Sequence, residues 1–171
     1  MKIIFISGPS GSGKTTLSKK VIEKIKSGIV LNTDNYYKTG LKSKLLSRFI
    51  DGYFDRSISF NFKLFKKDFF YILKNGISYH ERLYNFENKT IKKFLNQKDN
   101  IQFLIVEGIF ARDFSSTLCS QNYYFFELKI KKNECMKRVI LRDSKQRGKS
   151  LKKAKNDFLK SWDIYYEKLN Y

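Results

Sequence analysis

The chain has 171 residues, of which 42% are hydrophobic and 30% charged, a composition typical of one globular domain and not of a disordered chain. No apolar run approaches the roughly 18 residues of a membrane-spanning helix, so we expect a single cytoplasmic domain over 1–171 without membrane contact. The net charge is +19, but the 28 lysines and 7 arginines are spread over every segment of the chain. This distribution indicates a compositional bias rather than a single binding surface. Cys119, Cys135 and a single histidine offer no zinc-ligand spacing, and we expect two reduced thiols.

An apolar run near the N-terminus leads directly into a glycine-rich loop. Residues 2–7, KIIFIS, are apolar without alternation, as in a strand buried on both faces of a parallel sheet. The following GPSGSGKTT has the spacing of a loop whose backbone N–H groups wrap nucleotide phosphates. Apolar residues at helical spacing over 15–26 predict that this loop opens a helix. We expect a phosphate loop over 8–15, with contacts from Gly8, Ser10, Gly11, Ser12, Gly13, Lys14, Thr15 and the adjacent Thr16.

Two side chains of this loop have the chemistry that a nucleoside triphosphate requires. Lys14 can reach the β and γ oxygens, and the Thr15 hydroxyl can ligate Mg²⁺. A chance glycine turn is disfavoured because the pattern lies between a buried strand and an amphipathic helix. A GTPase is disfavoured as well, because the guanine-reading motif Asn-Lys-x-Asp has only the imperfect match NQKD at 96–99. The loop therefore predicts binding of ATP with Mg²⁺.

A second short strand is predicted over 28–32, and the loop 33–40, TDNYYKTG, follows it. Asp34 stands just after the strand, where its carboxylate could face the γ-phosphate and accept a proton from an acceptor hydroxyl. The alternative is an ordinary turn or cap residue, since aspartate is common in such loops. Position alone leaves both interpretations open.

The middle of the chain is rich in aromatic residues. The periodicity over 60–75 predicts a helix with phenylalanines on the buried face and lysines outside. Alternating aromatic and polar residues over 77–91 predict a hairpin or an irregular ribbon, in which His80 is given no role.

Two further buried strands and two helices are predicted in the last third of the chain. The strand over 101–108 contains Glu107 near its end, where a carboxylate could orient Mg²⁺ and its waters or simply face solvent. The remaining elements are a strand over 123–130 and helices over 133–142 and 151–169.

A basic segment, RDSKQRGKS, connects these two helices. It places Arg142, Arg147 and Lys149 on a glycine-hinged loop that can close over ATP and neutralise charge on the transferring phosphoryl group. A solvated basic turn is the alternative.

Strands that alternate with helices predict an α/β fold, and the phosphate loop before the first helix is typical of a P-loop NTPase fold. We expect a doubly wound, mostly parallel sheet with helices on both faces, a small substrate-binding hairpin within the region 34–94, and a lid over 142–150. Loops that carry chemistry leave the carboxyl ends of the strands in such sheets. Gly8, Asp34, Glu107 and the lid should therefore lie at one edge.

In combination, these motifs resemble the uridine kinase and phosphoribulokinase family, most closely its nucleoside kinases. The resemblance covers residues 3 to about 165. It rests on the phosphate loop and on five further stretches in the family's order, which are TDNYYK, FDRSISFN, YNF, IVEGIF and RDSKQRGKS.

The resemblance implies roles for individual residues. It places the catalytic base on Asp34, with Lys14, Arg142 and Arg147 also catalytic and Lys149 on the nucleotide. Glu107 would join Thr15 at the metal. The acceptor would contact Tyr37, Asp55 through its ribose hydroxyls, and Tyr84 and Phe86 on either side of its base.

Several positions depart from the family pattern. Lys89 stands where uridine-cytidine kinases have a histidine that reads the pyrimidine, and FDRSISFN lacks the histidine, proline and two carboxylates of the family's stretch. Lys149 replaces the last lid arginine, which keeps the charge but loses bidentate geometry. Longer members usually continue beyond the position of Tyr171 into a strand near the adenine; either that element is dispensable here or the adenine pocket is thinner.

We therefore expect an ATP-dependent kinase that phosphorylates a primary hydroxyl of a small molecule, most of all the 5′-hydroxyl of a nucleoside. Nicotinamide riboside, pantothenate and a phosphoribulokinase-like acceptor remain alternatives, and a homo-oligomer is compatible with the sequence. A nucleic-acid-binding P-loop ATPase or polynucleotide kinase would instead use the positive charge, with aromatic residues stacking on bases. The helical spacing of these aromatic residues favours a buried face.

Overall fold

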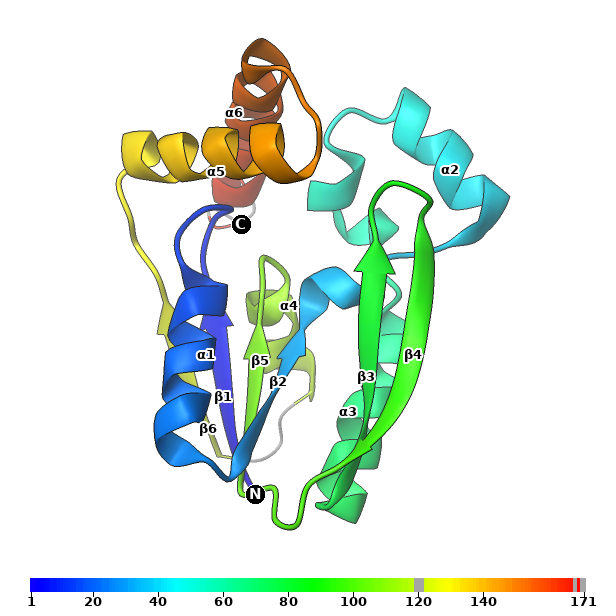
Figure 1. The fold of residues 1–171 in the computed structure, drawn as a ribbon, viewed down its shortest axis with the longest axis vertical. Coiled ribbons are helices and arrows are strands. Elements are labelled where there is room, and N and C mark those ends of the chain that lie inside the picture. Colours follow the sequence, from blue (N-terminus) through cyan, green and yellow to red (C-terminus); the bar gives the residue numbers. More distant parts are fainter. Residues whose placement is uncertain (119–121, 168, 170–171) are drawn as a thin grey trace.

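Four parallel strands form a sheet in the order β2-β5-β1-β6 (Figure 1). The computed structural model describes residues 1–118, 122–167 and 169. Every pairing in this sheet is parallel, so the carboxyl ends of the strands meet at one edge. The α/β fold with a mainly parallel sheet is therefore confirmed. The strands are β1 Lys2–Ser7, β2 Gly28–Asn32, β5 Phe103–Glu107 and β6 Tyr123–Glu127.

Helices cover both faces of this sheet (Figure 1). α1 (Lys14–Ile25) packs on β2 and β5 from one side. α3 (Phe62–Asn75) and α4 (Ala111–Leu118) lie on the other side. α5 (Lys132–Gln146) and α6 (Leu151–Glu167) pack against each other beyond the carboxyl edge.

The remaining elements form a second group beside the sheet. The antiparallel hairpin of β3 (Ser78–Asn85) and β4 (Thr90–Gln97) packs along α3, and α2 (Gly40–Phe49) lies near the hairpin tip (Figure 1). Three short 3₁₀ turns connect them, η1 Thr33–Tyr36, η2 Tyr53–Asp55 and η3 Ser57–Ser59.

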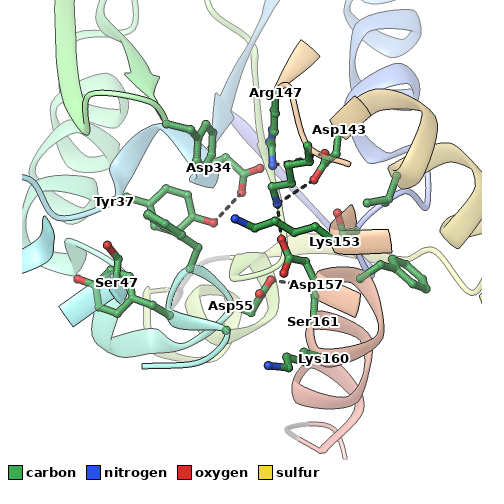
Figure 2. A pocket seen from close by; sticks show the side chains of 18 of the residues that line it. Asp34, Tyr37, Ser47, Asp55, Asp143, Arg147, Lys153, Asp157, Lys160 and Ser161 are labelled. Atoms are coloured by element: carbon green, nitrogen blue, oxygen red, sulfur yellow. Dashed lines mark hydrogen bonds and ion pairs between the residues drawn. The ribbon is translucent and has the colours of Figure 1, made fainter. Parts of the chain in front are cut away.

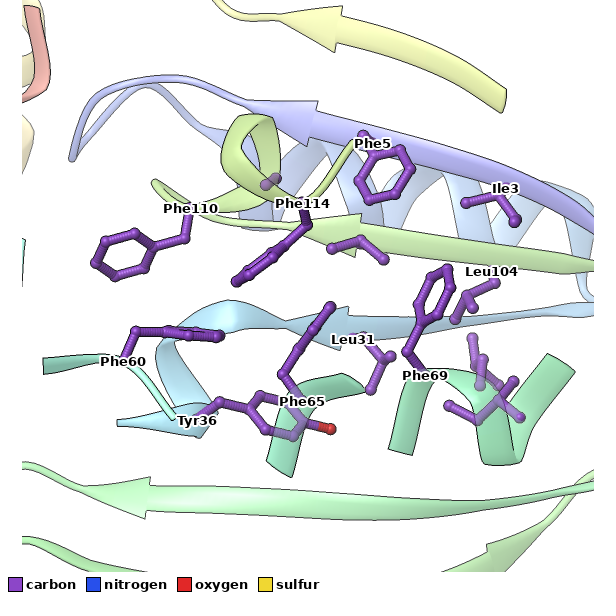
Figure 3. Close-up of a cluster of buried hydrophobic side chains, with 14 of the residues drawn as sticks. Ile3, Phe5, Leu31, Tyr36, Phe60, Phe65, Phe69, Leu104, Phe110 and Phe114 are labelled. Atoms are coloured by element: carbon purple, nitrogen blue, oxygen red, sulfur yellow. The ribbon is translucent and has the colours of Figure 1, made fainter. Parts of the chain in front are cut away.

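Aromatic side chains of α3 fill the space under the sheet, as Figure 3 shows. Phe65 and Phe69, one helical turn apart, are fully buried against Phe5 and Leu104 of the strands. The Asn61 side chain accepts a hydrogen bond from the Leu64 N–H and caps the helix. The predicted buried face is confirmed, and Phe65 and Phe69 are unavailable for stacking on nucleic-acid bases.

Some predicted boundaries were wrong. β4 continues to Gln97, whereas the hairpin was predicted to end near 91, and α5 continues to Gln146, so the first part of the predicted lid loop is helical. α2 and α4 were not predicted at all. Residue 168, at the end of the predicted last helix, and Cys119 lie outside the described residues.

The described residues contain no helix with the length and apolar character that crossing a membrane requires. β6 is an edge strand of the sheet, and its Tyr124 and Phe126 side chains are 56% and 52% exposed.

A buried carboxylate joins three elements of the structure. Asp68 of α3 is 1% exposed and accepts two hydrogen bonds from the Arg82 guanidinium of β3. The Tyr36 hydroxyl of η1 donates to the same carboxylate at 3.1 Å, and His80 Nδ1 lies 3.3 Å from it. These contacts compensate the buried charge and fix η1 relative to the hairpin.

We expect Asp68→Ala to destabilise the protein by about 3–5 kcal/mol, because it leaves the half-buried Arg82 charge without its partner. The matched control is Asp163→Ala, which removes an exposed ion pair with Lys132 at 3.4 Å and should cost no more than about 1 kcal/mol. Urea unfolding of both variants measures the difference. Equal losses would contradict a role for Asp68 beyond that of a surface ion pair.

Candidate active site

The phosphate loop packs directly on the backbone of α5. Gly11 has a φ of +80°, and a Cβ atom at this position would lie 2.6 Å from the Cys135 carbonyl oxygen. Only glycine therefore allows the loop to approach α5 this closely. Gly13, at φ +94°, then precedes the first turn of α1, so the N–H groups of that turn are directed toward the loop.

Lys14 closes the loop from inside. Its amine donates to the carbonyl oxygens of Gly8 and Pro9 at 2.8 and 3.0 Å, and the side chain is buried. Burial lowers the pKa of Lys14, although the nearby carboxylates Asp34 and Glu107 oppose this shift. Phosphate oxygens would compete with the two carbonyl oxygens for this amine.

The hydroxyl of Thr15 donates to Glu107 Oε1 at 2.9 Å and joins α1 to the end of β5. Glu107 is 1% exposed, and burial raises its pKa to about 7, with a further upward contribution from the Asp34 charge. Lys14 and the Thr15 hydrogen bond act in the opposite direction.

These oxygen donors fit Mg²⁺, which prefers carboxylate and hydroxyl ligands. The Ser12 hydroxyl is also buried in the loop and has no hydrogen-bond partner among the described residues. Within the same residues, no group of three or more His, Cys, Asp or Glu side chains could hold an ion alone. Phosphate oxygens and water would have to complete the coordination, as is usual for Mg²⁺ at nucleotides.

Asp34 lies in η1, directly after β2. The turn forms because the Asn32 side-chain oxygen accepts the Asp34 N–H at 2.7 Å. The Tyr37 hydroxyl donates to Asp34 Oδ1 at 3.5 Å (Figure 2). Burial raises the pKa of Tyr37 well above its usual value, and the charges of Asp34 and Asp55 add to the shift, so Tyr37 acts as a neutral hydrogen-bond donor.

A cleft of about 1060 Å³ extends from Asp34 between the hairpin tip and the α5–α6 pair. Figure 2 shows its polar side chains converging from several elements. One wall consists of four aromatic side chains in edge-to-face contact, with ring centroids 5.0 to 6.3 Å apart. These four side chains, which we call the aromatic wall, are Tyr37, Phe54, Tyr84 and Phe86.

Two polar groups of the cleft lie near this wall. The Tyr84 hydroxyl is buried without a hydrogen-bond partner among the described residues, and burial raises the pKa of Tyr84 to about 12. Asp55 Oδ1 accepts a hydrogen bond from the Ser161 hydroxyl of α6 at 2.7 Å. The predicted acceptor residues Tyr37, Asp55, Tyr84 and Phe86 thus line the same cleft as Asp34 and Ser10, whereas Thr16 is exposed on α1.

The basic residues of the predicted lid converge on a carboxylate that the sequence analysis missed. Asp143, which is 2% exposed, lies 2.8 Å from Arg142, 3.6 Å from Arg147 and 3.2 Å from Lys149. Burial alone would raise the pKa of Asp143, but these three cations outweigh it and hold the pKa below its usual value. The i,i+4 spacing of Asp143 and Arg147 is the sequence signal that could have revealed this pairing.

Lys149 also contacts Asp157 of α6 at 2.7 Å, and Lys153 points into the cleft (Figure 2). Neither Asp157 nor Lys153 was predicted. The Arg147 guanidinium lies over the Phe86 ring, 4.5 Å from its centroid. This contact connects the lid to the aromatic wall.

The comparisons with known proteins agree with this geometry. A family model, described as the phosphoribulokinase/uridine kinase family, matches residues 3–167. A protein of Borrelia duttonii named uridine kinase is 31% identical over 163 residues, which are 94% of this chain and 76% of that protein. The chain belongs to the phosphoribulokinase/uridine kinase family. Membership confirms the predicted P-loop kinase and, at the level of the family, an ATP-dependent phosphotransferase.

A second relative and a solved structure show how much of the chain is similar in sequence and in fold. The uridine kinase of Borrelia hermsii is 38% identical over 109 residues, so that match spans 64% of this chain and about half, 52%, of its relative. The solved structure of D-glycerate 3-kinase from Cryptococcus neoformans superposes with a TM-score of 0.70 at 13% identity, covering 97% of this chain and 78% of that one. This second likeness confirms the fold.

We expect Glu107→Gln to stabilise the metal-free protein in a pH-dependent way. The unfolded carboxyl ionises near pH 4.5 and the folded one at about 7, so the folded state loses stability as pH rises between these values. The variant and the wild type should be equally stable near pH 4.5, and at pH 8 the variant should be more stable by on the order of 2–3 kcal/mol. Urea unfolding in EDTA measures this, with the exposed Glu134→Gln as control. A difference that does not change with pH would contradict it.

Proposed function

We propose that the chain transfers the γ-phosphoryl group of ATP to a primary hydroxyl, in the first place the 5′-hydroxyl of a nucleoside. The main support for this proposal is that Asp34, the phosphate-loop residue Ser10 and the aromatic wall line the same cleft. The wall suits a planar ring, and the carboxylate suits a hydroxyl at the other end of the acceptor. In this proposal residues 34–94 bind the acceptor and 142–150 form the lid.

The nucleotide would bind with its phosphates on the N–H groups of residues 8–16 and on the Lys14 amine. Thr15 and Glu107 would hold Mg²⁺, which neutralises phosphate charge when it is bound. The phosphates would be approached from the lid by three cations, Arg142, Arg147 and Lys149. Each would either break its ion pair with Asp143 or keep it while it also contacts a phosphate. Their clustering on one buried carboxylate keeps the three cations together in the lining of the cleft.

Asp34 would act as the general base. The acceptor oxygen forms a bond to the γ-phosphorus, the bond from that phosphorus to the bridging oxygen of ADP breaks, and the hydroxyl proton passes to the Asp34 carboxylate. Tyr37 donates to Asp34 Oδ1 and so orients the carboxylate. Asp55, oriented by Ser161, is placed to accept hydrogen bonds from further acceptor hydroxyls.

The names of the relatives support a nucleoside acceptor, since the curated proteins of Borrelia hermsii and Borrelia duttonii are uridine kinases. Nicotinamide riboside fits the same arrangement of ring and hydroxyl. Pantothenate and sugar phosphates share only the primary hydroxyl, so the aromatic wall favours them less.

We expect Asp34→Asn to lower kcat by about 10² to 10⁴, because the amide cannot accept the proton. MgATP affinity should change by less than about threefold, since the substitution leaves the Lys14 amine and its hydrogen bonds in the phosphate loop unchanged. Coupled ADP release over a panel of nucleosides and other alcohols measures turnover, and calorimetry measures nucleotide binding. Unchanged turnover would remove Asp34 as the base.

We expect Lys14→Ala to weaken MgATP binding and turnover together, because the amine is the only side-chain cation inside the described phosphate loop. The matched control is Lys20→Ala, an exposed lysine on the same helix, which should bind and turn over normally. Normal nucleotide binding by Lys14→Ala would contradict the phosphate-loop assignment.

A further inference from the structure

Three cations gather where α2 meets the hairpin tip, at the acceptor end of the cleft. The Lys89 amine donates to the Ser47 hydroxyl and lies 6.0 Å from the centroid of the Phe54 ring. Ser47 and Arg48 line the main cleft, and Lys44 and Lys89 line an adjoining cavity of about 310 Å³. We call Lys44, Arg48 and Lys89 the basic rim.

Two of the carboxylates that line the same cleft as Arg48 are Asp51, which pairs with Lys160, and Asp55, which accepts a hydrogen bond from Ser161. Glu87 lies on the same hairpin tip and also lines the cleft, but it is exposed and makes no ion pair with any of the three cations. Burial lowers the pKa of Lys89, and the like charges of Arg48 and Lys44 lower it further. The rim is thus a site of mutual repulsion that an anion would relieve.

The backbone at Lys89 supports a functional reason for this cation. Its φ is +56°, a region that glycine or asparagine normally occupies in a turn, and its N–H closes the turn on the Asn85 carbonyl at 2.8 Å. A lysine here costs roughly 1 kcal/mol of backbone strain. Lys89 lines the smaller cavity, and its hydrogen bond to Ser47 holds the amine against a residue that lines the main cleft.

The position of the rim relative to Asp34 defines what it can contact. In Figure 2, Ser47 lies beyond Tyr37, on the side of the cleft opposite Asp143 and Lys153. An acceptor with its hydroxyl at Asp34 and its body along the aromatic wall therefore extends toward Ser47. The Tyr84 hydroxyl, buried and without a partner among the described residues, belongs to the same cleft.

We propose that the acceptor carries an anionic group, a carboxylate or a phosphate, at the end remote from its reacting hydroxyl, and that Arg48 and Lys89 bind this group. The proposal rests on the proposed function, because it assumes that the hydroxyl lies at Asp34. It narrows the acceptor from any ring-bearing alcohol to an acidic one.

Matched pairs of acceptors test the charge directly. Nicotinic acid riboside against nicotinamide riboside, and orotidine against uridine, differ by a carboxylate; ribulose 5-phosphate against ribulose differs by a phosphate. We expect at least a tenfold higher kcat/KM for the anionic member of one or more pairs in ADP release with MgATP. The pair that responds identifies carboxylate or phosphate as the bound group. A preference for the neutral member in every pair would overturn the proposal.

Variants of Lys89 distinguish recognition of an anion by its charge from a structural role of its hydrogen bond to Ser47. Lys89→Gln keeps a donor for Ser47 but removes the charge, so the preference for the anionic member should fall to about twofold or less. Lys89→Arg should retain the preference, and the exposed Lys92→Gln of β4 is the matched control and should retain it as well. A preference that survives both Lys89→Gln and Arg48→Gln would overturn the assignment of these residues.

Calorimetric titration of the same compounds distinguishes this proposal from the proposed function. Anionic members that bind the wild type more tightly than Lys89→Gln, but stimulate no ADP release, would support the anion site and contradict the kinase assignment. Anionic members that neither bind nor react, while a neutral partner is phosphorylated, would support the kinase and overturn the anion site.

Discussion

The register of β5 between β1 and β2 is the constraint on which the catalytic half depends. Glu107 lies opposite Ile6 of β1 and Asn32 of β2, so one residue position faces both the strand that leads into the phosphate loop and the strand that leads into Asp34. The following Gly108 allows the chain to leave the sheet against Thr33, because a Cβ atom there would lie 1.8 Å from the Thr33 hydroxyl oxygen. A slip of one residue would turn the Glu107 side chain to the other face of the sheet.

Local pattern was sufficient to predict this half. Buried parallel strands are nearly continuous apolar runs, and the phosphate loop has a fixed spacing, so Lys14, Asp34 and Glu107 could be placed at one edge from sequence. The half that contains α2 and the aromatic wall was harder to predict from the sequence. α2 was not predicted, although Leu41, Leu45 and Phe49 repeat at helical spacing. In the structure these side chains are exposed, so α2 does not bury an apolar stripe as the predicted helices do. The ion pairs of Asp68 with Arg82 and of Lys149 with Asp157 join residues from different elements, which no local pattern reveals.

The contact between Arg147 and Phe86 joins the two halves. Arg147 follows α5 and faces Asp143, while Phe86 lies at the tip of the hairpin and forms part of the aromatic wall. A ring bound beside Phe86 would change what Arg147 stacks on, and movement of Arg147 toward phosphates would uncover one side of the wall. In the proposed function, this pair of side chains would couple occupation of the acceptor site to closure of the lid.

The high positive charge of the chain opposes association through the exposed edge strand β6. β6 presents unpaired backbone groups together with Tyr124 and Phe126, and within this strand the only charge is Glu127, which pairs with Arg112. Edge strands of this kind tend to add the strand of another molecule. With a net charge of +19, two copies repel each other before their edges can meet, and this repulsion acts over about 10 Å at 0.1 M salt. From this charge we expect ionic strength to control the colloidal behaviour of the chain, with concentrated salt favouring edge-to-edge association.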